Sequence, residues 1–328
     1  MSFTNYILSE SYSYVQSLGD RLGEVKDLID WTQFVPIVSS LYHDNSITGG
    51  RPHTDEILLV KMCVLQQWYN LSDPALEREC NDRISFRHFL EYPDTIPDYS
   101  TIVDFRRRLV DSNADDLIWA ELQRQIDACE LRIIHGVIQD ATFIVADPGH
   151  APSDKPRGRA AQTRRSKDGT WAKKGNKSYF GYKMHILVDK EHFLIRRIAT
   201  TTAKVHDSKI DLSKEGETAY RDKGYFGVKP KASIDKTMKK AVRNKQLTEK
   251  DKRRNKAISR VRSKVEHPFA VIKRTFHGGT QLVTTVGKVH VKNMFSAFSY
   301  NIQRINTILK QSRKELAICR PAKQVEAG

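Results

Sequence analysis

The feature that most constrains this chain is one carboxylate inside an otherwise apolar, β-rich run. Residues 133–146 read Ile-Ile-His-Gly-Val-Ile-Gln-Asp-Ala-Thr-Phe-Ile-Val-Ala, with Asp140 in the interior. A strand that is apolar on both faces is normally central and buried. A carboxylate in such a strand costs several kcal/mol unless it is paired or binds a metal ion. Asp140 is therefore either half of a buried salt bridge or a metal ligand, and we favour the ligand.

Helical and strand-like patterns alternate around this run. Three further strands are expected at residues 179–188, 193–201 and 218–221, after a Pro-, Gly- and basic-rich loop at 147–177. Three successive strands, a fourth strand and then helices predict an α/β fold with a mixed sheet. Helical periodicity is expected in seven places, at residues 6–22, 54–68, 85–90, 100–110, 115–129, 248–274 and 293–309. Ser72 or Asp73 is expected to cap one more helix, which has Pro74 in its first turn, and Ser100 to cap the helix at 100–110.

The positive charge of the chain is concentrated in two segments. The 328 residues include 55 Lys and Arg against 39 Asp and Glu, a net charge of +16. Residues 151–177 hold nine basic residues against two acidic ones, and residues 229–274 hold seventeen against four. This clustering favours a polyanion such as DNA as the partner, over a merely soluble basic protein. We expect DNA contacts from Arg164, Arg165, Lys173, Lys174, Lys183, Arg262 and Lys273.

The cysteines and the hydropathy pattern bear on location. Cys63, Cys80, Cys129 and Cys319 have no metal-binding spacing and resemble ordinary cytosolic thiols. No signal peptide is recognisable, and no run of about 18 apolar residues predicts a membrane span. We expect a cytoplasmic or nucleoid-associated protein.

Two more acidic residues stand in contexts that suit catalysis. Asp222 ends the expected strand at 218–221 and precedes Lys223-Gly224-Tyr225, a pattern that is also ordinary turn chemistry. Glu266 lies in the helical pattern at 258–274, where Arg262 and Lys273 are expected to share its face. A solvated Arg262–Glu266 ion pair is the alternative there, and Pro268 predicts a kink or a restart of the helix.

Together the three acids suit a hard divalent cation, Mg²⁺ or Mn²⁺. Two such ions could activate a water molecule or a DNA 3′-hydroxyl and stabilise the leaving oxygen. No Ser/His/Asp or Cys/His arrangement competes with the acids for this role, and the absence of a P-loop argues against nucleotide hydrolysis.

An ordered set of short motifs identifies a family resemblance. From about Gly50 to Ile308, the sequence resembles transposases of bacterial insertion sequences, in the insertion-sequence-five family. The N-terminal motifs are Gly50-Arg51-Pro52, Asn70-Leu71-Ser72-Asp73, Phe86-Arg87-His88-Phe89 and Asp98-Tyr99-Ser100-Thr101. The later ones are Gln139-Asp140-Ala141-Thr142, Gly181-Tyr182-Lys183, Val205-His206-Asp207-Ser208, Asp222-Lys223-Gly224-Tyr225, Leu247-Thr248-Glu249-Lys250-Asp251, Arg262-Ser263-Lys264-Val265-Glu266 and Lys273.

The resemblance implies an RNase H-like catalytic core with Asp140, Asp222 and Glu266 as its metal-binding carboxylates. It also implies a prokaryotic protein, recognition of terminal inverted repeats, and synapsis of two DNA ends by a homo-oligomer. Ser259 stands where related enzymes often carry Tyr, which puts one contact to a flipped base or nearby phosphate in question. The segment between Asp207 and Asp222 is too short for a full helix between strands.

These inferences divide the chain into five regions. They are an N-terminal helical extension at 1–50, a helical domain at 51–112, a linking helix at 113–132, an RNase H-like catalytic domain at 133–310 and a C-terminal tail at 311–328. Short helices joined by tight turns, as in 51–112, are typical of helix-turn-helix DNA readers and equally of small helical bundles.

Two alternatives to a transposase remain open at the level of function. One is a catalytically inactive DNA-binding repressor derived from a transposase, and the other is a metal-dependent DNA nuclease that cuts without joining. Within the site, Asp207 is the rival of Asp222 for the second ligand position. We favour Asp222 and expect Asp207 to cap the short segment that follows the third strand.

Overall fold

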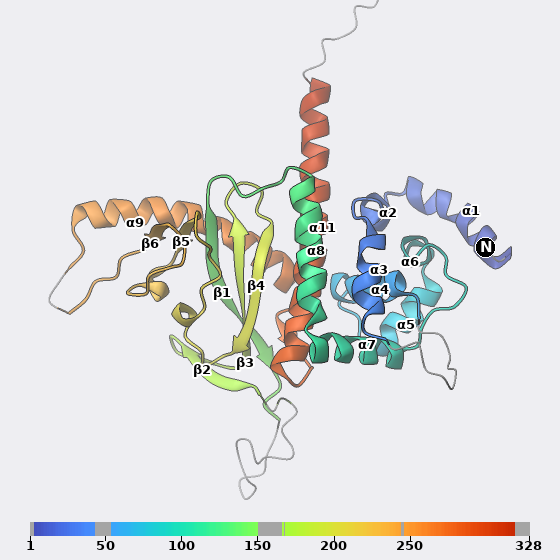
Figure 1. Ribbon diagram of the computed structural model, residues 1–328, viewed down its shortest axis with the longest axis horizontal. Coiled ribbons are helices and arrows are strands. Elements are labelled where there is room, and N and C mark those ends of the chain that lie inside the picture. Colours follow the sequence, from blue (N-terminus) through green and yellow to red (C-terminus); the bar gives the residue numbers. More distant parts are fainter. Residues whose placement is uncertain (1–2, 43–53, 150–165, 167, 244–245, 319–328) are drawn as a thin grey trace, which may run out of the picture.

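The computed structural model describes residues 3–42, 54–149, 166, 168–243 and 246–318. In Figure 1 a twisted sheet lies on one side of the molecule and a group of N-terminal helices on the other. Helices α8 (Ala114–Ala128) and α11 (Val286–Ile318) stand between them. No described helix is long and apolar enough to cross a membrane.

The N-terminal helices begin where the sequence offers acidic or hydroxyl caps. Ser72 caps α5 as expected, with Pro74 in its first turn. The expected cap at Ser100 is wrong: the cap of α7 is Asp98, two residues earlier, which accepts from Thr101 N–H at 2.7 Å. The helix expected at 6–22 is two helices, because Asp20 caps a new start after Gly19. The elements are α1 (Phe3–Ser17), α2 (Arg21–Lys26), η1 (Trp31–Phe34), α3 (Val35–Ser39), α4 (Glu56–Trp68), α5 (Asp73–Asp82), α6 (Ile84–Phe89) and α7 (Tyr99–Ser112).

The sheet is mixed, as expected, and β1 is its central strand. The antiparallel strands β4, β3 and β1 lie side by side, and β5 and β6 continue the sheet in parallel to β1. β2 extends the β3 edge, and β7 pairs in parallel with the end of β1. The strands are β1 (Val137–Ala146), β2 (Thr170–Lys174), β3 (Lys177–Asp189), β4 (Ile195–Thr202), β5 (Thr218–Arg221), β6 (Ile234–Thr237) and β7 (Thr280–Gln281).

The basic stretch at 147–177 is not loop throughout. Residues 170–174 form β2, which makes a hairpin with β3 in which Trp171 faces Phe180. The expectation of an unbroken loop fails there because β3 extends beyond β1 and offers its free edge to β2. Residues 150–165 and 167 lie outside the described residues.

The helical segment that carries Glu266 is interrupted, as Pro268 predicted. Helix α9 (Glu249–Arg262) ends in a 3-10 turn, η5 (Ser263–Val265), and α10 (Glu266–Ala270) restarts at the glutamate. A π-helical turn, η6 (Val271–Thr275), follows. Arg262, Glu266 and Lys273 therefore lie in three different helical segments, and the shared face expected of a continuous α-helix stays a prediction.

One hydrophobic core joins the two halves of the molecule. Trp31, Phe34 and Phe89 from the N-terminal helices belong to the same buried cluster as Tyr182 and Ile186 of β3. Helix α11 connects them, because Phe298 packs on Trp31 while Asn301 exchanges two hydrogen bonds with the backbone of Ile195 in β4. The helix is longer than the expected 293–309 in both directions.

Candidate active site

Asp140 lies in β1 with hydrogen-bonded strands on both sides. It shares a face of the strand with Ile138 and Ile144, which belong to the main core. Its side chain is 20% exposed, and one carboxylate oxygen accepts from the Ala141 N–H at 2.9 Å. Burial raises the pKa of Asp140, so the fold keeps a carboxylate where the low dielectric disfavours its charge.

Asp222 stands level with Asp140 on the neighbouring strand. The parallel register of β1 and β5 pairs Ile138 with Tyr220, and the two aspartates follow two residues later on each strand. The Asp222 carboxylate is close enough to raise the pKa of Asp140 further. Its Oδ1 accepts from Gly224 N–H at 2.7 Å and starts the 3-10 turn η4 (Lys223–Tyr225). The structure therefore brings the first two predicted acids together.

Arg262 pairs with Asp140 and not with Glu266. Its Nη2 donates to Asp140 Oδ2 at 2.7 Å, although 122 positions separate the two residues. The Nε of Arg262 is buried without a hydrogen-bond partner. The pairing follows from the end of α9 at Arg262, where η5 packs against β1. The local ion pair that the sequence offered as an alternative is absent between these described side chains.

Glu266 is exposed and is the first residue of α10. It follows η5 directly, so its backbone is held near the strand that carries Asp140. Among the described residues, no three His, Cys, Asp or Glu side chains form a group that could hold a metal ion. The structure thus unites Asp140 and Asp222, and it does not bring Glu266 into a three-carboxylate group with them.

Asp207, the rival second ligand, is committed to a lysine. Lys183 of β3 donates from Nζ to Asp207 Oδ1 at 2.8 Å and to the Val205 carbonyl at 2.8 Å. The predicted cap is wrong by one residue, because His206 accepts from Ser208 N–H and caps η3 (Asp207–Lys209). The turn η3 packs against η4, so Asp207 lies in the neighbourhood of Asp222.

Two buried side chains around Asp222 had no sequence signal of their own. Arg221 is fully buried. It donates from Nε to Thr237 Oγ1 at 2.8 Å and from Nη2 to the Val228 carbonyl at 2.5 Å. These two hydrogen bonds connect β5 to β6 and to the loop after η4. The Tyr225 hydroxyl is buried without a hydrogen-bond partner. Burial and then the charges of Asp140 and Asp207 raise the pKa of Tyr225. The sequence showed Tyr225 only as one letter of a motif.

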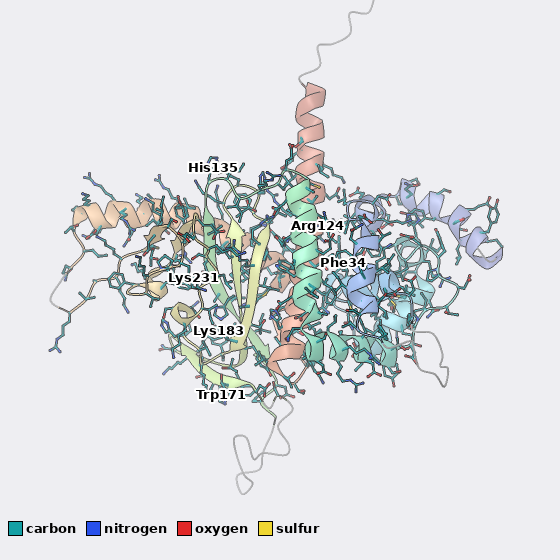
Figure 2. The ribbon with its side chains drawn as sticks, viewed as in Figure 1. Phe34, Arg124, His135, Trp171, Lys183 and Lys231 are labelled. Atoms are coloured by element: carbon teal, nitrogen blue, oxygen red, sulfur yellow. The ribbon has the colours of Figure 1, made fainter. Side chains whose placement is uncertain are left out.

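The residues expected to contact DNA divide into three groups. Lys173 and Lys174 are exposed at the end of β2 next to the hairpin turn, and Trp171, labelled in Figure 2, lies at the start of the same strand. Lys183 is largely buried and paired with Asp207, so it supports the sheet more than it faces a partner. Lys273 is half-buried in η6. Arg164 and Arg165 lie outside the described residues.

The donor set of the site suits a hard divalent cation. Asp140 and Asp222 supply carboxylate oxygens from adjacent strands, and their mutual repulsion is what a cation between them would relieve. Each carboxylate has one oxygen engaged by a backbone N–H, which fixes its orientation. Arg262 supplies a counter-charge to the other Asp140 oxygen, Oδ2, which no backbone N–H engages among the described residues.

Two family models match the chain, and together they cover both halves of it. The Transposase DDE domain matches residues 134–302, and the Transposase domain (DUF772) matches residues 10–108. No solved structure was found to match the chain.

Proposed function

Because the chain belongs to the family of DDE transposases, we propose that it cuts and joins DNA at the terminal inverted repeats of an insertion sequence. Members of this family are DNA-binding enzymes that depend on divalent metal ions. Within the family we assign the chain to the insertion-sequence-five group, on the order of its motifs. We propose Mg²⁺ or Mn²⁺ as the metal, two ions per site, and a homo-oligomer that holds two DNA ends together.

The observation that carries the assignment of the site is the parallel register of β1 and β5. It supports Asp140 and Asp222 as a pair of ligands, since both follow the Ile138–Tyr220 pair by two residues. Glu266 is proposed as the third ligand, from the segment that packs on β1 through η5. When bound, the metal ions lower the pKa of the attacking water or 3′-hydroxyl and stabilise the leaving oxygen.

The chain's own residues have separate parts in this proposal. Asp140 and Asp222 bind the metal in orientations fixed by their backbone hydrogen bonds. Arg262, which pairs with Asp140 here, has a planar fork suited to a phosphate of the scissile strand. Lys173, Lys174 and Lys273, with Arg164 and Arg165, hold the DNA backbone, and the helices at 54–112 read its sequence.

The test is cleavage and strand transfer with Asp140→Asn, Asp222→Asn and Glu266→Gln. Each substitution is close in size to the residue it replaces, removes one negative charge and should reduce both reactions by at least about a thousandfold, while DNA binding in EDTA persists. Asp207→Asn is the comparison, with its folding checked by thermal melting because it breaks the Lys183 pair. If Asp222→Asn stays active and a folded Asp207→Asn does not, Asp207 is the second ligand instead.

The same assay separates the two alternatives. A repressor would bind the element's ends but leave them uncut in Mg²⁺, and a nuclease would cut them without joining the 3′-ends to a target DNA. Joined products that depend on added Mg²⁺ or Mn²⁺ exclude both.

A further inference from the structure

Two lysines without a counter-ion line a pocket between the N-terminal helices and the end of the sheet. Lys273 comes from η6 and Lys292 from α11, and the turn Asn70–Ser72 between α4 and α5 forms the opposite wall. The pocket has a volume of about 530 Å³. Its described lining contains no acidic side chain, and no hydrogen bond or ion pair is found for either ammonium group.

The surroundings make the positive charge of this pocket uncompensated. Burial lowers the pKa of Lys292, and Arg106 lowers it further; burial and then Lys174 lower the pKa of Lys273. The negative charge of Asp73 acts in the opposite direction and raises the pKa of Lys292. Asp73 already accepts a hydrogen bond from Arg106 at 2.7 Å. Arg106 and Lys292 therefore share the single carboxylate of Asp73. Removing this excess positive charge from water costs free energy unless an anion binds beside it.

Lys292 also lines a second pocket, with a volume of about 230 Å³. That lining holds Lys288, the Arg106–Asp73 pair and Arg107, which pairs with Asp104 at 3.1 Å. Lys174, near Lys273 on the other side, continues the positive charge to the exposed β2–β3 hairpin. These cations extend from β2, across the boundary between the sheet and the N-terminal helices, to α7. Such an arrangement matches successive phosphates of a DNA strand better than one small anion.

We propose that Lys273 and Lys292 form a phosphate-binding site, in which the backbone of a DNA strand lies in the seam between the N-terminal helices and the catalytic sheet. The DNA identity of the ligand rests on the proposed function. Lys292 is the residue that the sequence did not mark, because it lies in an amphipathic helix outside both basic segments.

The first test is DNA affinity in EDTA, measured by fluorescence anisotropy with a short duplex over a range of NaCl concentrations. Lys292→Met and Lys273→Met should each weaken binding roughly tenfold, and should each flatten the slope of log affinity against log salt by about 0.9. Lys292→Arg should retain most of the affinity. Lys214→Met, at an exposed position remote from both pocket linings, is the charge-matched control and should change affinity less than twofold.

Thermal melting distinguishes this role from a structural one. Because Lys292 is a partly buried cation with no ion pair of its own among the described residues, Lys292→Met should keep or raise the melting temperature while it weakens DNA binding. A variant that melts lower and binds DNA normally would show that Lys292 only supports the fold, and would overturn the proposal.

Inorganic phosphate separates the possible sources of the anion. It should raise the melting temperature of the unaltered protein more than NaCl of equal ionic strength, and should not do so for Lys292→Met. Stabilisation by phosphate with unchanged DNA affinity in both lysine variants would assign the pocket to a free anion and overturn the DNA assignment. All of these measurements omit metal, so they stand apart from the cleavage test of Asp140 and Asp222.

Discussion

Arg262 and a divalent ion compete for the same oxygen of Asp140. Oδ1 of Asp140 accepts from the Ala141 N–H, and Oδ2 accepts from the Arg262 guanidinium. If Asp140 binds a metal ion through Oδ2, the ion has to displace the guanidinium. We predict that Arg262→Gln binds Mn²⁺ more tightly by up to about fivefold, since the displaced ion pair is worth up to ~1 kcal/mol at a partly exposed site. Strand transfer should nevertheless fall about tenfold, because a phosphate contact is lost.

Isothermal titration with Mn²⁺ and a strand-transfer assay measure the two effects. Arg260→Gln, an exposed position near the end of α9, serves as the control and should leave both quantities near their original values. Unchanged Mn²⁺ affinity in Arg262→Gln would mean that the pair with Asp140 does not oppose metal binding.

The pairing of Arg262 also shows which parts of a site a sequence can reveal. Asp140 could be recognised from its apolar surroundings in the sequence, because burying a lone carboxylate in a strand costs free energy that a functional role would explain. The pair of Arg262 with Asp140 was not foreseen, and only a pair with Glu266 was weighed as the alternative, because sequence spacing reports neighbours on one helix and not a contact across 122 positions. The burial of Arg221 and Tyr225 likewise depends on how β5, β6 and η4 pack together.

At the scale of elements, strand β3 carries a glycine that the sheet requires. Gly181 has a φ of +136°, and a Cβ there would lie 2.4 Å from the Ile144 carbonyl oxygen and 2.8 Å from Ala146 N. We predict that Gly181→Ala lowers the free energy of unfolding by more than ~2 kcal/mol, since backbone strain and a clash with β1 add together.

Gly175, at the turn of the β2–β3 hairpin, is the matched control. Its φ is +58°, and a Cβ would meet nothing within 4 Å, so Gly175→Ala should cost no more than about 1 kcal/mol. Urea denaturation of both variants makes the comparison. Equal losses would show that φ alone, and not the approach of β1, accounts for the effect at Gly181.

The same strand buries a histidine that makes the fold sensitive to acid. His185 is fully buried and bonded to Thr201 Oγ1 at 2.9 Å, and burial lowers its pKa to about 4. A lowered histidine pKa means that the unfolded chain takes up the proton first, so stability falls as pH drops from about 6.5 towards 4. We predict a loss of about 3 kcal/mol from this residue at pH 4.

Denaturation curves at pH 7 and pH 4 check this prediction through a variant. His185→Gln should show a smaller difference between the two pH values than the unaltered protein does. His135→Gln, whose side chain is 59% exposed (Figure 2), should keep the full difference. An undiminished acid loss in His185→Gln would assign the sensitivity to other groups.

The elements themselves were predictable where a periodic pattern was long or bounded by turn residues. The strand at 218–221 has its predicted bounds, and the helix expected at 115–129 is α8 within one residue at each end. The mixed α/β sheet is confirmed, and with the family match it is consistent with an RNase H-like core. β2, β6 and β7 were missed because they are short edge segments with exposed residues, whose strand geometry comes from their partners.

At the scale of the whole molecule, the N-terminal helices and the sheet depend on one helix. Figure 1 shows α11 between them, and its buried face contributes to the single main core. Ser299 donates to the Val64 carbonyl in α4, while Asn301, two positions on, bonds to the backbone of Ile195 in β4. N-terminal helices joined in this way cannot rearrange independently of the sheet without breaking core contacts, which keeps the pocket that holds Lys292 in a fixed geometry.

The last prediction follows from that shared core. Phe298 on α11 is fully buried against Trp31 and Phe34, both in the N-terminal part. Phe298→Ala should cost about 3–5 kcal/mol. If the two halves unfold together, amide exchange measured by mass spectrometry should accelerate as much in β3 as in α4, although β3 does not carry a partner of the lost ring. Ile134→Ala, at a position 65% exposed, should alter neither. Faster exchange confined to the N-terminal helices would show two independently stable units, and the seam between them would then be free to open.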